Sequence, residues 1–544
     1  MLGLPASRLV HGTARHNLVL FPLMLSPSSP NSHLMPTPLG RLDRAAIGYL
    51  TLPLLIFVVS WFEWWAAVPL LACSLFALRP LVGPLPAAGP ESRLTRLQLT
   101  AAMVAAVAWT LCGGATHFLF ANADWFVRDA VLHDLVESPW PVGYGLLDGR
   151  ETLLRAPIAF YLPAALAGKA LGLPAAHWCM GLWTAMGTSL FLLQVLSLLP
   201  AKPKWVVASI AVVILFSGFD IVGNIINTGP RFLQHWSIAR HLEWWAGTYQ
   251  YSSMTTQLFW VPNHALGGWL LIGLMARHAR YSALDTVLPL LLVAAALWSP
   301  LSAVGVLPFA AWKAYRSVFV ERRWGLLHPR VWLPALVVGS MTVAYLILDP
   351  SRIPKGLSVG GGDLADTVMA LLSQAQFFLL EAGLIGFAIL AIRPSAEIVI
   401  ALAVLALLPL AHLGPGNDLV MRASIPSLAV LTIGACLAFS RECLEASALR
   451  KKVVLACLLA IGAVTPVQEF ARAAILPSWP VNLQVTLIGT NCGAYPAHYV
   501  ARLGGQIADH FLKSPHAVPV GSTDKLACDN PAVDLMWQGG LLSD

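Results

Sequence analysis

A run of acidic side chains is the clearest candidate for chemistry in this sequence. Residues 122–155 read NADWFVRDAVLHDLVESPWPVGYGLLDGRETLLR and hold six of the 27 acidic residues. Asp124 directly follows an apolar segment, and Asp129 and Asp134 lie further along the same run. A carboxylate that is partly shielded from water can have a raised pKa and act as a general base. A solvated loop, acidic only because basic residues are kept elsewhere, explains the pattern equally well.

The spacing within this run predicts a short amphipathic helix from Asp124 to Glu137. Asp124 and Arg128 are four residues apart, as are Asp129 and His133, so each pair can interact along one helix face. The apolar positions of this helix are Trp125, Phe126, Val131, Leu132 and Leu135.

Aromatic and polar side chains are concentrated in residues 220–257 and in the WVPNH sequence that follows at 260–264. Flat aromatic faces pack on the apolar faces of sugars, while amide and imidazole groups reach hydroxyls. Tryptophan also anchors helices at membrane interfaces, which is the simpler reading for any one of them. The density of polar partners nevertheless favours a binding surface. Its candidate residues are Arg231, Trp260, Asn263 and His264.

A third candidate is the sequence GPGNDLVMR at 414–422, which directly precedes an apolar segment. The guanidinium of Arg422 is a natural partner for a lipid-linked phosphate, and Asp418 lies one helical turn before it. An equally good explanation of Arg422 at this position is that its side chain extends to a lipid head group. Arg352 and Lys355 are weaker phosphate candidates.

Composition dictates the elements that must hold these residues. The 544 residues are 57% hydrophobic and 11% charged, with a mean hydropathy of +0.70. Soluble domains average roughly 25% charged residues. Apolar runs near the length that crosses a bilayer recur from Ala45 to Phe470. We therefore expect an all-α fold, a polytopic transmembrane helical bundle of about 11–14 spans, with a long helical first outer loop.

Charge and motifs exclude other classes of protein. The net charge of +7 does not indicate a nucleic-acid partner, because no basic stripe interleaves with aromatics. Lys and Arg instead accumulate in loops that remain in the cytoplasm. The sequence has no P-loop, no GxGxxG after a strand and no HExxH zinc motif. Soluble nucleotide chemistry on the cytoplasmic side is therefore disfavoured.

Basic residues also predict the orientation of the spans. Arg41 and Arg44 precede the first span, which places the N-terminus in the cytoplasm. Residues 45–78 are interrupted by the aromatic sequence WFEWW, which predicts two short helices. The resulting parity gives about 13 spans, with residues 157–173 and 364–377 re-entrant or interfacial. The substantial outside segments are then 121–156, 220–257, 349–363 and 471–544.

The chain divides into three parts. We expect residues 1–40 to be a disordered or over-extended N-terminus, with Met35 as an alternative start. Residues 41–470 form the transmembrane core, and 471–544 form a small extracytoplasmic tail. Cys492 and Cys528 lie in that tail, where an oxidising compartment would let them form a disulfide.

These features together resemble the C-type (GT-C) membrane glycosyltransferases. The resemblance rests on an odd number of spans, a long acidic first outer loop that begins at a helix end, and polar outer mouths. WVPNHALGGWL at 260–270 and NDLVMRASIP at 417–426 look like blocks of uncharacterised bacterial members. The first loop and the proline-tyrosine stretch after it carry the rest, in Asp124-Trp125 through Trp140-Pro141, Tyr144 and Pro157-Ile158-Ala159-Phe160-Tyr161-Leu162-Pro163.

The resemblance implies an inverting transfer of a sugar from a polyprenyl-phosphate donor to a glycan, lipid or protein acceptor. The reaction would take place at the outer face of a bacterial inner membrane. Asp124 would be the general base, assisted or replaced by Asp134. The closely spaced acidic pair of the family is missing, which keeps Asp129 as a third choice and leaves divalent-metal dependence open. Donor phosphate and substrate would be bound by Arg422, His264, Arg231, Asn263, Asp418, Trp260 and Tyr161.

Two rival functions remain open at this stage. A transporter or flippase of lipid-linked glycans would use the same aromatic and arginine features without a required carboxylate. Few charged residues inside the spans and no repeat between the two halves disfavour it. A polysaccharide polymerase or ligase, or a membrane acyltransferase, would depend more on His235, His241 and His264.

Overall fold

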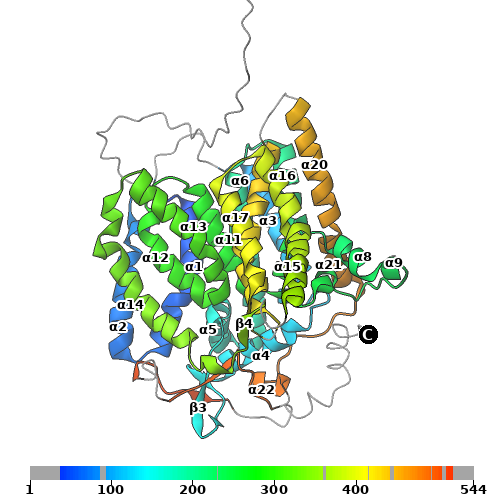
Figure 1. Ribbon diagram of the computed structural model, residues 1–544. Coiled ribbons are helices and arrows are strands. Elements are labelled where there is room, and N and C mark those ends of the chain that lie inside the picture. Colours follow the sequence, from blue (N-terminus) through cyan, green and yellow to red (C-terminus); the bar gives the residue numbers. More distant parts are fainter. Residues whose placement is uncertain are drawn as a thin grey trace, which may run out of the picture. The chain divides into compact units, whose positions relative to one another are not determined.

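The computed structural model describes residues 37–85, 94–229, 231–358, 363–414, 416–440, 446–491, 493–504 and 510–518. Residues 1–36 of the expected disordered or over-extended start lie outside this part of the chain, as do Cys492 and Cys528, so the predicted disulfide stays a prediction. The described chain is mostly helical (Figure 1), as the composition predicts.

Seven of the described helical segments are long and apolar enough to cross a membrane. This is the behaviour expected of a multi-pass membrane protein, while the total of about 13 spans stays a prediction. Shorter apolar helices of 10–17 residues accompany them. The seven segments are Arg41–Trp61, Leu173–Ser197, Pro203–Thr228, Trp324–Leu346, Leu364–Ile392, Asp418–Ser440 and Ala446–Ile475.

The first half of the chain provides ten helices among the described residues. Phe62 and Glu63 separate the first two, so the aromatic interruption does divide residues 45–78 into two helices. Thr95 caps the N-terminus of the third helix. Its side-chain hydroxyl accepts from the backbone amide of Gln98, and the Gln98 side-chain oxygen accepts from the backbone amide of Thr95. The helices are α1 (Arg41–Trp61), α2 (Trp64–Ala77), α3 (Arg96–Leu111), α4 (Asp124–Glu137), α5 (Leu162–Leu171), α6 (Leu173–Ser197), α7 (Pro203–Leu215), α8 (Asp220–Thr228), α9 (Arg231–Gln234) and α10 (Met254–Trp260).

The second half begins several of its helices with proline, which suits the first helical position because its missing N–H would be unpaired there anyway. Pro262, Pro300 and Pro329 each have this role. The described helices are α11 (Pro262–Arg277), α12 (Leu284–Trp298), α13 (Pro300–Tyr315), α14 (Pro329–Leu346), α15 (Leu364–Phe378), α16 (Leu384–Ile392), α17 (Ala396–Leu407), α18 (Asp418–Ala423), α19 (Ile425–Ser440), α20 (Ala446–Gly462), α21 (Val464–Ile475) and α22 (Leu487–Thr490).

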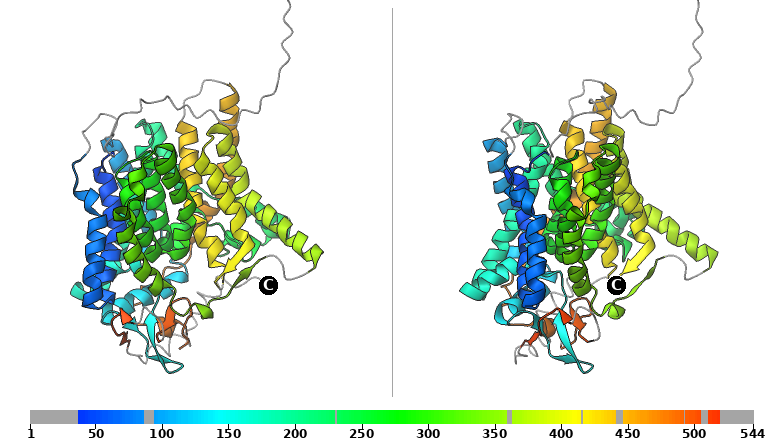
Figure 2. Two further views of the ribbon diagram at one scale, coloured as in Figure 1. Left: turned by 60° about the vertical axis from the view of Figure 1, so that its left-hand side comes forward. Right: turned by 90° about the vertical axis from the view of Figure 1, so that its left-hand side faces the viewer.

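The two segments of ambiguous span assignment behave differently. α5 has ten residues, about 15 Å of helix, which is too short to cross a bilayer and agrees with a re-entrant or interfacial role. Residues 364–377 were expected to be a separate segment of that kind, but α15 continues through a π turn (Leu379–Gly383) into α16. Figure 2 shows the lime-green α15 leaning away from the other helices.

Short strands join the first loop to the C-terminal tail. β2 (Leu146–Leu147) and β3 (Arg150–Leu154) form a hairpin, and β6 (Val500–Arg502) pairs antiparallel with β3. β1 (Val142–Gly143) pairs with β7 (His516–Ala517), and β4 (Lys355–Leu357) pairs with β5 (Ala411–Leu413). The described part of the tail therefore completes the sheet of the first loop.

In Figure 1, α4, β3, β4 and α22, which belong to three of the segments predicted to lie outside, gather at the lower end of the helices, whereas α8 and α9 of residues 220–257 lie about halfway up at the right edge. Arg472 donates to the Asn122 side chain at 3.2 Å, and Arg352 donates to the Tyr495 carbonyl at 2.9 Å. The opposite end carries basic helix termini, among them Arg277, whose Nε lies 2.7 Å from the Asp43 carboxylate. The predicted orientation of the helices in the membrane stays a prediction.

Candidate functional site

The helix predicted from Asp124 to Glu137 is present with those bounds as α4. Trp125 holds the first turn of α4 in place, because its side chain is fully buried and its indole N–H donates to the Phe259 carbonyl at 2.7 Å. Gly114 permits this packing, since a Cβ there would lie 2.0 Å from the Trp125 indole nitrogen. The acidic residue that begins the helix is thereby held next to the start of α11.

Asp124 forms the predicted ion pair with Arg128, at 2.8 Å between carboxylate oxygen and Nη2. The Arg128 side chain is 2% exposed and the Asp124 side chain 45% exposed. Arg128 also donates through Nε to the Trp260 carbonyl at 2.9 Å. Burial alone would lower the pKa of Arg128, but Tyr161 and Asp124 raise it. A fixed cation thus orients a carboxylate that stays open to a substrate.

Asn263 Oδ1 is buried near this pair and has no hydrogen-bond partner among the described residues. Arg128 and the Tyr161 hydroxyl interact with each other, and neither Arg128 Nη1 nor that hydroxyl has a further partner among the described residues. Buried polar groups in proteins are nearly always paired, so unpaired ones need an explanation. A bound substrate that presents phosphate or hydroxyl oxygens would satisfy the two donors, and a substrate hydroxyl would satisfy Asn263.

Arg422 lies on α18 and pairs with Asp418 at 2.9 Å. The loop before it has two residues with positive φ, Gly414 at 88° and Asn417 at 56°. Gly414 is required there, because a Cβ would lie 2.1 Å from an Asp418 carboxylate oxygen. The Arg422 side chain remains 25% exposed, so its guanidinium is available to an anion.

Electrostatic interactions connect α18 to α4. Burial raises the pKa of Tyr499, while Arg128 and Arg422 both act to lower it and Asp124 and Asp418 act to raise it. His498 is exposed, yet partial desolvation together with Arg422 lowers its pKa to about 4. The tail residues His498 and Tyr499 therefore lie within electrostatic range of both the Asp124–Arg128 pair and the Asp418–Arg422 pair. The two ion pairs thus lie around a common surface.

His264 lies at the start of α11 on the same side. It is buried, its Nδ1 is 2.9 Å from the Ser299 hydroxyl, and it interacts electrostatically with Arg422 and Arg128. The structure thus brings together seven of the ten predicted residues. They are Asp124, Tyr161, Trp260, Asn263, His264, Asp418 and Arg422.

Asp129 and Asp134, the other two candidate bases, are fully buried. Asp129 Oδ2 accepts a hydrogen bond from the backbone amide of Asn482 at 3.0 Å. His117 Nε2 lies 3.1 Å from the same oxygen. Asp134 accepts from the Leu487 amide at 3.0 Å. Both carboxylates bind the returning tail to α4, so of the three only Asp124 is placed to meet a substrate.

Asp134 is held by further groups. The Tyr144 hydroxyl donates to it at 3.0 Å, and His133 Nδ1 lies 3.0 Å away. Burial raises the pKa of Asp134, and the hydrogen bonds from His133, Leu487 and Tyr144 oppose that shift. The assisting role suggested for Asp134 is therefore replaced by a structural role in this geometry.

Arg231 is the predicted residue that lies away from the others. It is exposed on α9, which projects at the right edge of the bundle in Figure 1, whereas α4 lies centrally. His235 directly after α9 is also exposed. The sequence alone placed Arg231 with Trp260 and His264 because all three fall in or next to one aromatic-rich segment.

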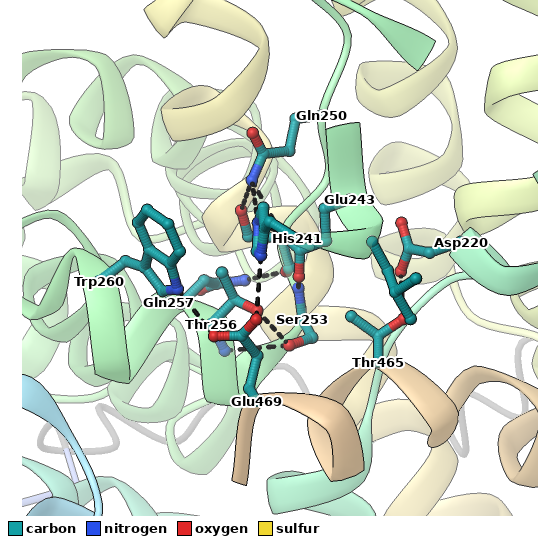
Figure 3. A network of polar contacts seen from close by, with 12 residues as sticks. Asp220, His241, Glu243, Gln250, Ser253, Thr256, Gln257, Trp260, Thr465 and Glu469 are labelled. Atoms are coloured by element: carbon teal, nitrogen blue, oxygen red, sulfur yellow. Dashed lines mark hydrogen bonds and ion pairs between the residues drawn. The ribbon is translucent and has the colours of Figure 1, made fainter. Parts of the chain in front are cut away.

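A buried polar network lies next to the site and includes Trp260 (Figure 3). His241 lies between Glu469 at 2.9 Å and Glu243 at 3.4 Å. Glu469 also accepts from the Trp260 indole at 2.8 Å. Burial alone would lower the pKa of His241, but the two carboxylates raise it to about 9. The network positions Trp260, whose carbonyl in turn holds Arg128.

Among the described residues, no group of three or more His, Cys, Asp or Glu side chains converges as metal ligands would. Asp124 and Asp418 are instead each paired with an arginine. The guanidinium groups of these two pairs are positive charges available to a phosphate in this geometry.

The contribution of the tail has no signal in the sequence. His498 and Tyr499 are separated from α4 by more than 350 residues, and no local pattern indicates their return. Arg128 was recognised only as a partner of Asp124, and its contact with Trp260 has no sequence signal. Glu469 was missed because it lies in a predominantly apolar segment.

Comparison with known proteins adds no assignment. No protein-family model matches the chain, and neither the curated proteins nor the solved structures contain a match.

Proposed function

We propose that the protein is a membrane glycosyltransferase that moves a sugar from a polyprenyl-phosphate donor to an acceptor hydroxyl at the outer face of the inner membrane. The observation that carries the proposal is the convergence of an accessible carboxylate, Asp124, with an accessible guanidinium, Arg422. A general base for an acceptor and a cation for a leaving phosphate are the two groups that such a transfer needs.

In the proposed reaction, the acceptor oxygen attacks the anomeric carbon of the sugar from the face opposite the phosphate. The bond between that carbon and the phosphate oxygen breaks, and polyprenyl phosphate leaves with the electron pair. Asp124 takes the acceptor proton, and Arg422 stabilises the charge on the leaving phosphate. Configuration at the anomeric carbon inverts. Tyr161 and Arg128 supply further donors for substrate oxygens.

The test is glycosyl transfer by purified protein in lipid nanodiscs, with a panel of radiolabelled polyprenyl-phosphate sugars. Asp124→Asn is expected to lower the rate at least about 100-fold, the usual contribution of a general base. Glu137→Gln is the matched control, because Glu137 lies exposed on the same helix and should leave transfer unchanged. A folded Asp124→Asn protein with full activity would exclude this base.

A second candidate is a transporter of lipid-linked glycans, favoured by one observation. Asp220 at the start of α8 and Glu381 in the π turn interact with each other, and the Phe219 amide donates to the Leu380 carbonyl at 3.1 Å. Buried carboxyl groups within apolar segments are typical of proton-coupled carriers. Loss of lipid-linked glycan movement in Glu381→Gln, with no transfer by wild type on any donor, would favour this function.

A further inference from the structure

A cavity of about 500 Å³ lies at the end of the helices opposite the candidate site. The site uses the first turn of α11, at Asn263 and His264, whereas the cavity is lined by the last turns of that helix, at Met275 and Ala276. The remaining walls come from α13, α17 and α19. The volume falls in the roughly 300–1,000 Å³ range of ligand pockets.

The cavity is apolar in its body and charged at its mouth. Ile272, Phe309, Val430, Ile433 and Leu437 line the body. The charged lining residues are Lys313 at the end of α13, Arg316 in the π turn that follows it, Arg393 between α16 and α17, and Glu397 in the first turn of α17.

The charges at the mouth do not cancel. Arg316 meets Glu397 at 3.8 Å, while Arg393 is exposed and its side chain has no hydrogen-bond or ion-pair partner among the described residues. Lys313 is held by Asp285 at 3.2 Å. Lys451 on α20 donates to the Ala391 carbonyl at 3.1 Å, which brings a further cation close to Arg393.

The apolar body of this cavity suits an apolar occupant, because cavities of this kind stay dry and can bind apolar molecules. Protein interiors are packed as densely as organic crystals, and apolar cavities do not fill with water. Acyl chains are the apolar molecules available at a membrane surface, and basic pockets between helices bind the head groups of anionic lipids. Guanidinium groups suit phosphate because they donate two parallel hydrogen bonds.

We propose that this cavity binds one anionic glycerophospholipid from the leaflet at that end, with an acyl chain against Phe309 and Ile433 and its phosphate between Arg316 and Arg393. The site is independent of glycosyl transfer, since it lies at the other end of α11. It would stabilise the packing of α11, α13, α17 and α19.

The experiment titrates delipidated protein in detergent with dioleoyl phosphatidylglycerol and, separately, dioleoyl phosphatidylcholine, and counts retained lipids by native mass spectrometry. Wild type is expected to retain one phosphatidylglycerol and to discriminate against phosphatidylcholine. Arg393→Gln should weaken phosphatidylglycerol binding about fivefold, the contribution of one basic residue. Because Arg393 is exposed and unpaired, this variant should fold normally.

Two further variants separate the cavity from general surface charge. Ala276→Phe should fill the body and release the lipid while leaving every cation in place. Arg330→Gln removes an exposed arginine at the same end that does not line the cavity, and it should bind phosphatidylglycerol as wild type does. Equal retention of the two lipids, wild-type binding by Arg393→Gln or Ala276→Phe, or equal weakening by Arg330→Gln would each overturn the proposal.

Discussion

At the scale of single residues, burial separates side chains that look alike in the sequence. Asp124, Asp129 and Asp134 share one acidic run, and nothing in their spacing ranks them. The fold exposes Asp124 and buries the other two, because the tail supplies backbone amides to Asp129 and Asp134. Spacing alone could therefore not choose among the three, and the role of Asp124 as the base stays a prediction.

His241 makes a prediction at the same scale. Its pKa in the folded protein, about 9, lies above the ordinary value of about 6.5, because Glu469 and Glu243 outweigh burial. The protonated imidazole therefore stabilises the fold fully below about pH 6.5, and this contribution, about 3 kcal/mol at most, is lost as the pH rises through 9. The melting temperature of wild type in nanodiscs should fall across that window.

His241→Asn should melt lower at pH 6.5 and should lack this decline, because no imidazolium remains to be lost. His235→Gln is the control, since His235 is exposed in the same segment and should keep the wild-type profile. An identical decline in His241→Asn would assign the pH dependence to other groups.

At the scale of elements, local patterns predicted what local forces determine. The bounds of α4 and the break at Phe62 and Glu63 follow from amphipathic spacing and from an aromatic interruption. The continuation of α15 into α16 was missed, because a π turn at Leu379–Gly383 has no marker in an apolar run. The return of the tail was also missed, because hydrogen bonds between distant residues define it.

The contact between α4 and α22 can be tested through Asp134. Asp134→Ala removes the acceptor of the buried Leu487 amide and of the Tyr144 hydroxyl. Each unsatisfied buried donor costs roughly 1–3 kcal/mol, so we expect a loss of about 2–4 kcal/mol in the free energy of unfolding. Limited proteolysis should then cut within residues 476–491, and melting should occur at lower temperature.

Glu137→Ala provides the comparison on the same helix, because Glu137 is exposed and should leave both readouts unchanged. Protection of residues 476–491 in Asp134→Ala would show that other contacts hold the tail. In that case the capping role assigned to Asp134 would be wrong.

At the scale of the whole molecule, the candidate site and the basic residues of the loops lie at opposite ends of the helices. The first loop, the 411–422 segment and the tail meet at one end, while basic residues mark the other. The segment between α13 and α14 carries Arg316, Arg322 and Arg323 against Glu321, and Arg330 follows in the first turn of α14. The positive-inside rule predicts that this end faces the cytoplasm and that the candidate site faces outward.

Two turn tips test this orientation directly. Gly149 and Arg322 are both exposed, both have positive φ and lie at opposite ends of the helices, and exposed tips tolerate insertions. An epitope inserted after Gly149 should bind antibody on intact spheroplasts, and one inserted after Arg322 only after permeabilisation. The reverse pattern would place Asp124 and Arg422 in the cytoplasm. Transfer chemistry could then remain, but the donor and acceptor would have to meet inside the cell, and the outer-face assignment would fail.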